Sequence, residues 1–101
     1  GGETVYWAEV ESALFDHEDV LECAVFSVPD DRLGEEVGAA IMLKKDALVQ
    51  GDDLRTFCAS RISKYKVPRY IWLVSESLPR NASGKFLKRQ LREDLDVANA
   101  E

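Results

Sequence analysis

The chain has 101 residues, of which 46% are hydrophobic and 32% are charged, a size and composition typical of one globular domain. No apolar run approaches the roughly 20 residues that a membrane-spanning helix needs, so we expect neither a transmembrane segment nor a signal peptide, and a cytoplasmic location. The net charge of −6 argues against general nucleic-acid binding, which is typical of strongly basic domains.

Charge is divided unevenly along the chain. Residues 1–53 contain 14 acidic and 3 basic side chains, a net charge of −11, whereas residues 54–101 contain 5 acidic and 10 basic side chains, a net charge of +5. If the second half forms one face, that face is suited to an anion or an acidic partner.

The first half of the chain predicts a helix followed by two strands. We expect residues 4–6 to be extended and residues 7–16 to form a helix, because apolar side chains recur there at helical spacing. Residues 20–28 are rich in β-branched and apolar side chains and predict a buried strand. A second strand is expected over residues 35–43, where Gly38-Ala39-Ala40 leaves room for a group packed closely above it.

The second half predicts a helix, a strand and a final helix. Asp52 or Asp53 can cap a helix that runs to about Ile62, and a basic loop over residues 63–69 follows it. Residues 70–74 predict the third strand, and the last helix ends near Asp96, before a fraying tail. This order predicts an α+β fold in which helices pack on a small three-stranded sheet.

Cysteine and histidine usage limits the chemistry. Cys23 and Cys58 lie in apolar patterns, so we expect buried free thiols, as in a reducing cytosol. His17 is the only histidine, which excludes a multi-histidine metal site, and its position favours the surface at a helix end.

The stretch from Leu78 to Arg92 joins a turn to an amphipathic helix. Its first part, Pro79 to Gly84, is rich in residues that favour turns, and its second part places three leucines at helical spacing. Lys85 lies at the junction between the two parts. A flexible ammonium held there suits an anionic ligand, and a solvated loop lysine is the alternative.

Three motifs occur in a fixed order along the chain. They are Gly-Gly-Glu-Thr-Val-Tyr at residues 1–6 with Ala-Glu-Val-Glu at 8–11, Val-Pro-Asp-Asp-Arg-Leu-Gly-Glu at 28–35, and Lys-Tyr-Lys-Val-Pro at 64–68 with Leu-Pro-Arg-Asn-Ala-Ser-Gly-Lys at 78–85. Together they resemble the C-terminal domain of adenylate-forming enzymes, the superfamily of acyl-CoA synthetases, carrier-protein adenylation domains and beetle luciferases. The resemblance extends over nearly the whole of residues 1–101, which we read as one such domain.

Details of the motifs refine the resemblance. Gly-Gly-Glu before Val-Tyr is similar to acyl-CoA ligases that activate fatty or aryl acids. Trp7 stands where proline is common, which alters the start of the helix. Leu33 replaces a tryptophan that many members have beside the CoA route, so stacking on CoA at this position does not follow from the resemblance.

The resemblance implies a two-step reaction. A carboxylic acid attacks the α-phosphate of ATP and releases pyrophosphate, and the CoA thiol then attacks the acyl-adenylate and expels AMP. ATP with magnesium, and the acid, would bind mainly to a large N-terminal domain outside this sequence, with no metal site on residues 1–101. That domain is the expected partner, the present one acting as a mobile lid, and we expect the isolated chain to fold but to be inactive.

The resemblance also assigns residues to the first step. Lys85 is the expected catalytic residue, because a fixed cation that bridges carboxylate and phosphate oxygens lowers the barrier without transferring a proton. Arg80 either assists with phosphates or forms a surface pair with an acidic side chain.

Four further residues match the CoA side of the family. Gly2 corresponds to a glycine that lines the pantetheine tunnel, where a side chain would block the thiol. Tyr65, Lys66 and Arg69 correspond to a loop that meets the nucleotide end of CoA in some members, and their charge suits its phosphates. A solvated loop is the alternative for these three residues.

Two other functions remain open from the sequence. One is the C-terminal domain of a carrier-protein adenylation enzyme, in which a tethered phosphopantetheine replaces CoA. The other is a free-standing module that uses the basic second half to bind an acidic protein or a nucleic acid.

Overall fold

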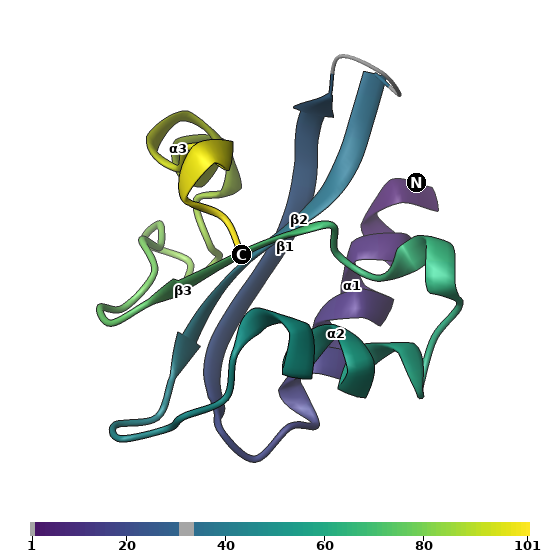
Figure 1. The fold of residues 1–101 in the computed structure, drawn as a ribbon. Helices are drawn as coiled ribbons and strands as arrows, with labels where there is room; N and C mark the ends of the chain where they lie inside the picture. Colours follow the sequence, from purple (N-terminus) through teal and green to yellow (C-terminus); the bar gives the residue numbers. More distant parts are fainter. Residues whose placement is uncertain (1, 31–33) are drawn as a thin grey trace.

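The computed structural model describes residues 2–30 and 34–101 (Figure 1). In chain order its elements are α1 (Gly2–Phe15), β1 (Val20–Asp30), β2 (Gly34–Leu43), α2 (Gly51–Ala59), the 3₁₀ turn η1 (Lys64–Lys66), β3 (Tyr70–Val74), α3 (Lys88–Asp94) and the 3₁₀ turn η2 (Val97–Asn99). The predicted α+β class and the predicted order of the main helices and strands are confirmed.

The three strands form one mixed sheet in the order β1-β2-β3. β1 pairs with β2 antiparallel, and β2 pairs with β3 parallel. A parallel pair needs a long crossover connection, and α2 lies within the connection from β2 to β3.

Helices cover both faces of the sheet. Side chains that alternate along each strand point to opposite faces, so Val25 and Ile41 pack beneath α1 and α2, whereas Phe26 and Trp72 pack beneath α3. Figure 1 shows α1 and α2 to the right of the sheet and α3 to its left. Burial on both faces explains why the sequence of β1 is an almost continuous apolar run.

The start of the chain differs from the prediction. Residues 4–6 were expected to be extended, but α1 is helical from Gly2. An extended segment needs a neighbouring strand for its backbone hydrogen bonds, whereas a helix forms these bonds within itself. The local sequence pattern of residues 4–6 predicted an extended segment, but it identified no strand with which that segment could pair.

The second helix also begins and ends differently from the prediction. Gln50 is its N-cap, and the backbone amide of Gln50 donates a hydrogen bond to Oδ2 of Asp53 at 2.8 Å. Asp53 therefore caps the helix from inside its first turn, where a carboxylate also complements the helix dipole. The helix ends at Ala59, before Ile62.

The C-terminal residues are fixed by hydrogen bonds, so the expectation of a fraying tail was wrong. The indole Nε1 of Trp72 donates to the carbonyl oxygen of Asp96 at 2.8 Å, and the amide of Glu101 donates to the carbonyl oxygen of Ile71 at 2.7 Å. Oε1 of Glu101 accepts from the amide of Gly51 at 2.9 Å. The tail thereby joins the α3 side of the sheet to the start of α2.

Both cysteines are buried and free, as the sequence predicts. Burial raises the pKa of the Cys58 thiol to about 11, and burial together with the nearby Glu11 carboxylate raises the pKa of Cys23 still further. Both thiols are protonated at neutral pH, and such thiols are poor nucleophiles and poor metal ligands. His17 lies just beyond α1, where its Nδ1 accepts a hydrogen bond from the amide of Asp19 at 3.1 Å.

Residues 2–30 and 34–101 contain neither a metal-binding cluster nor a membrane-spanning helix. No group of three histidine, cysteine, aspartate or glutamate side chains is arranged to hold a metal ion there. No helix in those ranges is long and apolar enough to cross a membrane.

Gly38 permits close packing at the centre of the sheet, as the small residues of β2 predicted. A Cβ atom added to Gly38 would lie 3.0 Å from Cζ3 of Trp72 and would also overlap Cγ2 of Val28. Both neighbours are buried, and neither is a flexible side chain that can move aside at low cost.

We therefore expect Gly38→Ala to lower the free energy of unfolding by about 1–3 kcal/mol through overpacking. Urea denaturation followed by tryptophan fluorescence measures the change. An unaltered midpoint would mean that Val28 and Trp72 shift without strain.

Candidate functional site

Lys85 lies on a hairpin that spans residues 80–86, here called the Lys85 hairpin. An antiparallel bridge joins Arg80 to Phe86. The side-chain oxygen of Asn81 accepts hydrogen bonds from the amides of Ser83, at 2.9 Å, and Lys85, at 3.0 Å. Asparagine can replace a backbone carbonyl in a turn in this way, and Gly84 supplies the positive φ of 85° that the turn requires.

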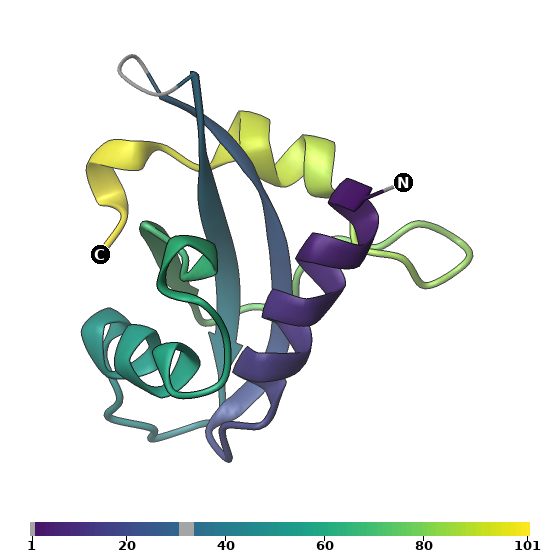
Figure 2. The ribbon, with the colours of Figure 1, turned by 90° about the vertical axis from the view of Figure 1, so that its right-hand side faces the viewer.

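The amino group of Lys85 is available to a ligand. Lys85 is exposed, and no carboxylate of the described residues lies within ion-pair distance of its Nζ. Figure 2 shows the hairpin, in yellow-green, projecting on the right from the body of the domain. Its backbone is held by the turn itself, so the lysine side chain is not needed to hold the hairpin together.

Arg80 contacts groups within the domain. Its Nη2 lies 3.4 Å from Oε2 of Glu22, and its guanidinium carbon lies 4.3 Å from the ring centre of Phe86. Of the two alternatives that the sequence left open for Arg80, the pair with an acidic side chain is therefore present.

Residues 63–69, here called the basic loop, are attached to α1. Nζ of Lys66 lies 2.8 Å from Oε2 of Glu9 and 5.5 Å from the ring centre of Tyr6. The hydroxyl of Tyr6 donates to the carbonyl oxygen of Tyr65 at 3.2 Å. The hydrogen bond to Glu9 raises the pKa of Lys66, so the lysine stays charged and its first partner is inside the domain.

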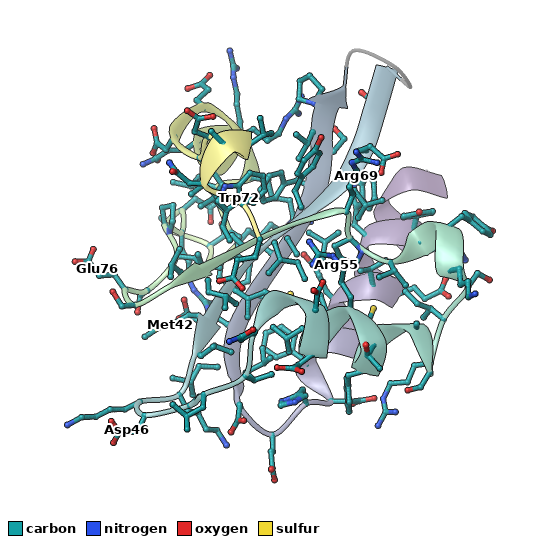
Figure 3. All side chains as sticks on the ribbon, in the orientation of Figure 1. Met42, Asp46, Arg55, Arg69, Trp72 and Glu76 are labelled. Carbon is teal, nitrogen blue, oxygen red and sulfur yellow. The ribbon has the colours of Figure 1, made fainter. Side chains whose placement is uncertain are left out.

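The end of the basic loop is attached to α2 and β2. Nε of Arg55 donates to the carbonyl oxygen of Pro68 at 2.9 Å, and Nη2 of Arg55 donates to that of Arg69 at 2.6 Å. The amide of Arg69 donates to the carbonyl oxygen of Val37 at 2.9 Å. Figure 3 shows Arg55 and Arg69 near each other at the right-hand end of β3. With its backbone fixed, Arg69 keeps an exposed guanidinium.

A hollow of about 390 Å³ lies beside the basic loop. It is lined by Tyr6, Trp7, Ser27, Glu35, Glu36, Val37 and Tyr65. Aromatic rings and carboxylates therefore meet there, and Tyr65 is 75% exposed. The sequence identified Tyr65 as a site residue but missed the others, because the hollow forms only when α1, the β1–β2 hairpin and the basic loop come together.

The structure separates the predicted site residues into two groups. Figures 1 and 2 place the Lys85 hairpin and η1, at the centre of the basic loop, on different sides of the domain. The basic side chains of the second half therefore do not all lie on one face, so the condition set for a single anion-binding face is not met. Gly2 is the first residue of α1, the helix that carries Tyr6 and Glu9, and Leu33 lies outside the described residues.

Comparison with known proteins agrees with the motifs. A family model described as the AMP-binding enzyme C-terminal domain matches residues 9–85. A mitochondrial medium-chain acyl-CoA ligase of Rattus norvegicus is 43% identical over 96 residues, covering 95% of this chain and 15% of the relative. A 2-succinylbenzoate–CoA ligase of Geobacillus kaustophilus is 47% identical over 92 residues, covering 91% and 19%.

Solved structures give the same result. Apo MatB from Rhodopseudomonas palustris superposes with a TM-score of 0.81 at 34% identity, covering 87% of this chain and 17% of that one. The o-succinylbenzoate CoA synthetase MenE from Bacillus subtilis, in complex with its acyl-adenylate intermediate, gives a TM-score of 0.79 at 37% identity, covering 94% and 18%.

The present chain thus spans less than a fifth of the length of each of these relatives. The family model matches most of the chain, and its match begins in α1 and ends at Lys85. On this evidence the chain belongs to the family of AMP-binding enzyme C-terminal domains.

Proposed function

We propose that the chain is the mobile C-terminal domain of a longer ATP-dependent, AMP-forming ligase that joins a carboxylic acid to CoA. In this proposal it supplies Lys85 for acyl-adenylate formation and part of the CoA tunnel for thioester formation. The observation that carries the proposal is the exposed ammonium of Lys85 on a self-supporting hairpin, in a chain of this family.

Electrostatics explains what Lys85 does in the first step. The acid and ATP are both anions, and negative charge is present on the transferring group and on the departing pyrophosphate. An ammonium held between the carboxylate and the α-phosphate reduces their repulsion and aligns them, and its attraction strengthens as water leaves the closing site. Because the hairpin fixes the backbone of Lys85, little reorganisation is needed when the substrates arrive.

The basic loop suits the second step. Arg69 and Tyr65 are exposed, so a guanidinium for phosphate and a ring for stacking are both accessible. Lys66 is bound to Glu9, and we infer that it mainly holds the loop on α1 and adds positive potential for the nucleotide end of CoA. Gly2 would line the tunnel that admits the thiol.

The separation of Lys85 from the basic loop favours a domain that rotates between the two steps of the reaction. Lys85 and the basic loop lie on different sides of the domain (Figures 1 and 2), so one rigid orientation cannot present both to the same pocket. We propose that the protein's own N-terminal domain binds ATP, magnesium and the acid, and that the present domain rotates against it.

The names of the similar ligases and the state of the cysteines bear on the acid and on the compartment. We propose a fatty or aryl acid, because the similar ligases are named for medium-chain acyl and 2-succinylbenzoate substrates. We propose a reducing compartment such as the cytoplasm, because the two buried thiols are free.

The identity of the thiol acceptor can be tested directly. Three curated proteins similar to this chain are named as CoA ligases or acyl-CoA synthetases, which favours CoA over a carrier protein. The full-length enzyme should form a thioester with free CoA and not with a phosphopantetheinylated carrier protein. Binding of nucleic acid that weakens steeply with salt would instead favour an independent anion-binding module.

Substitution of Lys85 tests its role in the first step of the reaction. In the full-length enzyme, Lys85→Ala should lower the rate of acyl-adenylate formation by at least about 10²–10³-fold, because a preorganised charge is lost from the transition state. ATP–pyrophosphate exchange measures this step. Thioester formation from supplied acyl-adenylate and CoA should remain nearly unchanged.

Lys45→Ala is the matched control for Lys85, since Lys45 is an exposed lysine on the loop after β2, and it should leave both steps unaltered. Equal losses in the two steps of Lys85→Ala would show that this lysine has a structural role.

Substitution of Gly2 tests its role in the second step of the reaction. A Gly2→Leu change should spare pyrophosphate release but strongly reduce acylation of CoA, because an added side chain would obstruct the thiol tunnel. Thioester formation from supplied acyl-adenylate measures the loss. Wild-type acylation by this variant would remove Gly2 from the tunnel.

A further inference from the structure

Glu22 holds the chain where it enters the Lys85 hairpin. Its side chain is 18% exposed, and it extends from β1 toward the connection that follows β3. Oε1 accepts a hydrogen bond from the amide of Leu78 at 2.7 Å, and Oε2 lies 3.4 Å from Nη2 of Arg80. Leu78 is itself buried against the sheet. One carboxylate therefore binds both the backbone and a side chain at the incoming end of the hairpin.

Glu11 holds the chain where it leaves the hairpin. Its side chain is 21% exposed, and Oε2 lies 3.1 Å from Nζ of Lys88, the first residue of α3. The same oxygen accepts a hydrogen bond from the amide of Val25 in β1 at 2.8 Å. This arrangement connects α1, β1 and the start of α3 through one carboxylate.

The hairpin neck, formed by Leu78, Pro79, Leu87 and Lys88, connects these two points. The amide of Leu87 donates to the carbonyl oxygen of Pro79 at 2.9 Å, and the amide of Lys88 donates to that of Phe86 at 3.0 Å. The turn is thus internally bonded, but its orientation relative to the sheet depends on what grips the neck. Glu22 and Glu11 grip its two sides with charge-assisted hydrogen bonds, which are stronger than neutral ones.

We propose that Glu11 and Glu22 are positioning residues that set the orientation of Lys85 for acyl-adenylate formation. The inference rests on the proposed role of Lys85. Neither carboxylate lies within ion-pair distance of the Lys85 amine in the described structure, so they hold the hairpin without neutralising its cation. Their effect reaches the substrate only through the placement of that amine.

Small displacements matter for such a group. A shift of about 1 Å in a catalytic group can cost about 10²-fold in rate. We therefore expect Glu22→Gln or Glu11→Gln in the full-length enzyme to lower ATP–pyrophosphate exchange by about 10- to 100-fold. Thioester formation from supplied acyl-adenylate should change by less than about 2-fold, because that step does not use the hairpin.

The split between the two steps separates positioning from general stability. A carboxylate that only stabilises the fold would, when lost, reduce both steps in proportion to the amount of folded enzyme. Glu93→Gln is the matched control, because Glu93 is an exposed glutamate of α3, 3.6 Å from Arg89, and it should leave both steps intact. Thermal melting of each variant checks that the comparison is made on folded protein.

A double substitution tests whether the carboxylates act through Lys85. In the Lys85→Ala background, adding Glu22→Gln should cause no further loss of residual adenylate formation, since there is no amine left to misplace. A further 10-fold loss would overturn the inference. If Glu22→Gln fails to fold, Lys88→Gln removes the partner of Glu11 at the outgoing end of the hairpin and should give the same split between the steps.

The outcomes also distinguish this inference from the proposed function. If Lys85→Ala retains adenylate formation, the proposed role of Lys85 fails. If Lys85→Ala is inactive in that step but both glutamine variants are unaffected, only the positioning inference fails. Loss in one glutamine variant alone would overturn the two-sided grip.

Discussion

The side-chain oxygen of Asn81 is the acceptor on which the candidate site depends. It receives the amides of Ser83 and Lys85 and so closes the turn with main-chain donors and one side-chain acceptor. The turn is complete without the lysine amine, so that amine can remain in solvent. The energetic cost of removing its water arises only when a ligand covers it. A hairpin that used its lysine as a structural ion pair would have to break that pair before binding substrate.

Helix α1 supports both groups of site residues. Glu9 and Glu11 are two positions apart, which places their side chains about 200° apart around a helix. Glu9 accordingly reaches the basic loop, and Glu11 reaches β1 and the start of α3. Val10, between them, is fully buried in the core. The two groups are therefore attached to one rigid element, and any rotation that exchanges them must move them together.

Local chemistry made part of this structure predictable. Runs of β-branched and apolar residues indicated strands, the small residues near Gly38 indicated close packing, and turn-forming residues marked the Lys85 hairpin. Contacts between distant segments were not predictable in this way. The pair of Glu9 and Lys66 joins residues that are 57 positions apart, and the attachment of Glu101 depends on β3 being an edge strand. The same limitation explains the error at the chain start, where no local signal distinguishes a strand without a partner from a helix.

The uneven charge of the sequence has a structural explanation that composition alone did not suggest. Most of the ion pairs in the described structure join an acidic residue of the first half to a basic residue of the second half: Asp16 with Arg61, Glu9 with Lys66, Glu22 with Arg80, Glu11 with Lys88, and Asp52 with Arg55. The two halves therefore neutralise each other within the fold, and individual surface pairs of this kind add little stability. These ion pairs have a greater effect on which charged side chains remain unpaired. Lys85 and Arg69 have no ion-pair partner among the described residues, and they lie at separate places. The exposed cations of the second half therefore remain in separate places and do not merge into one broad basic surface.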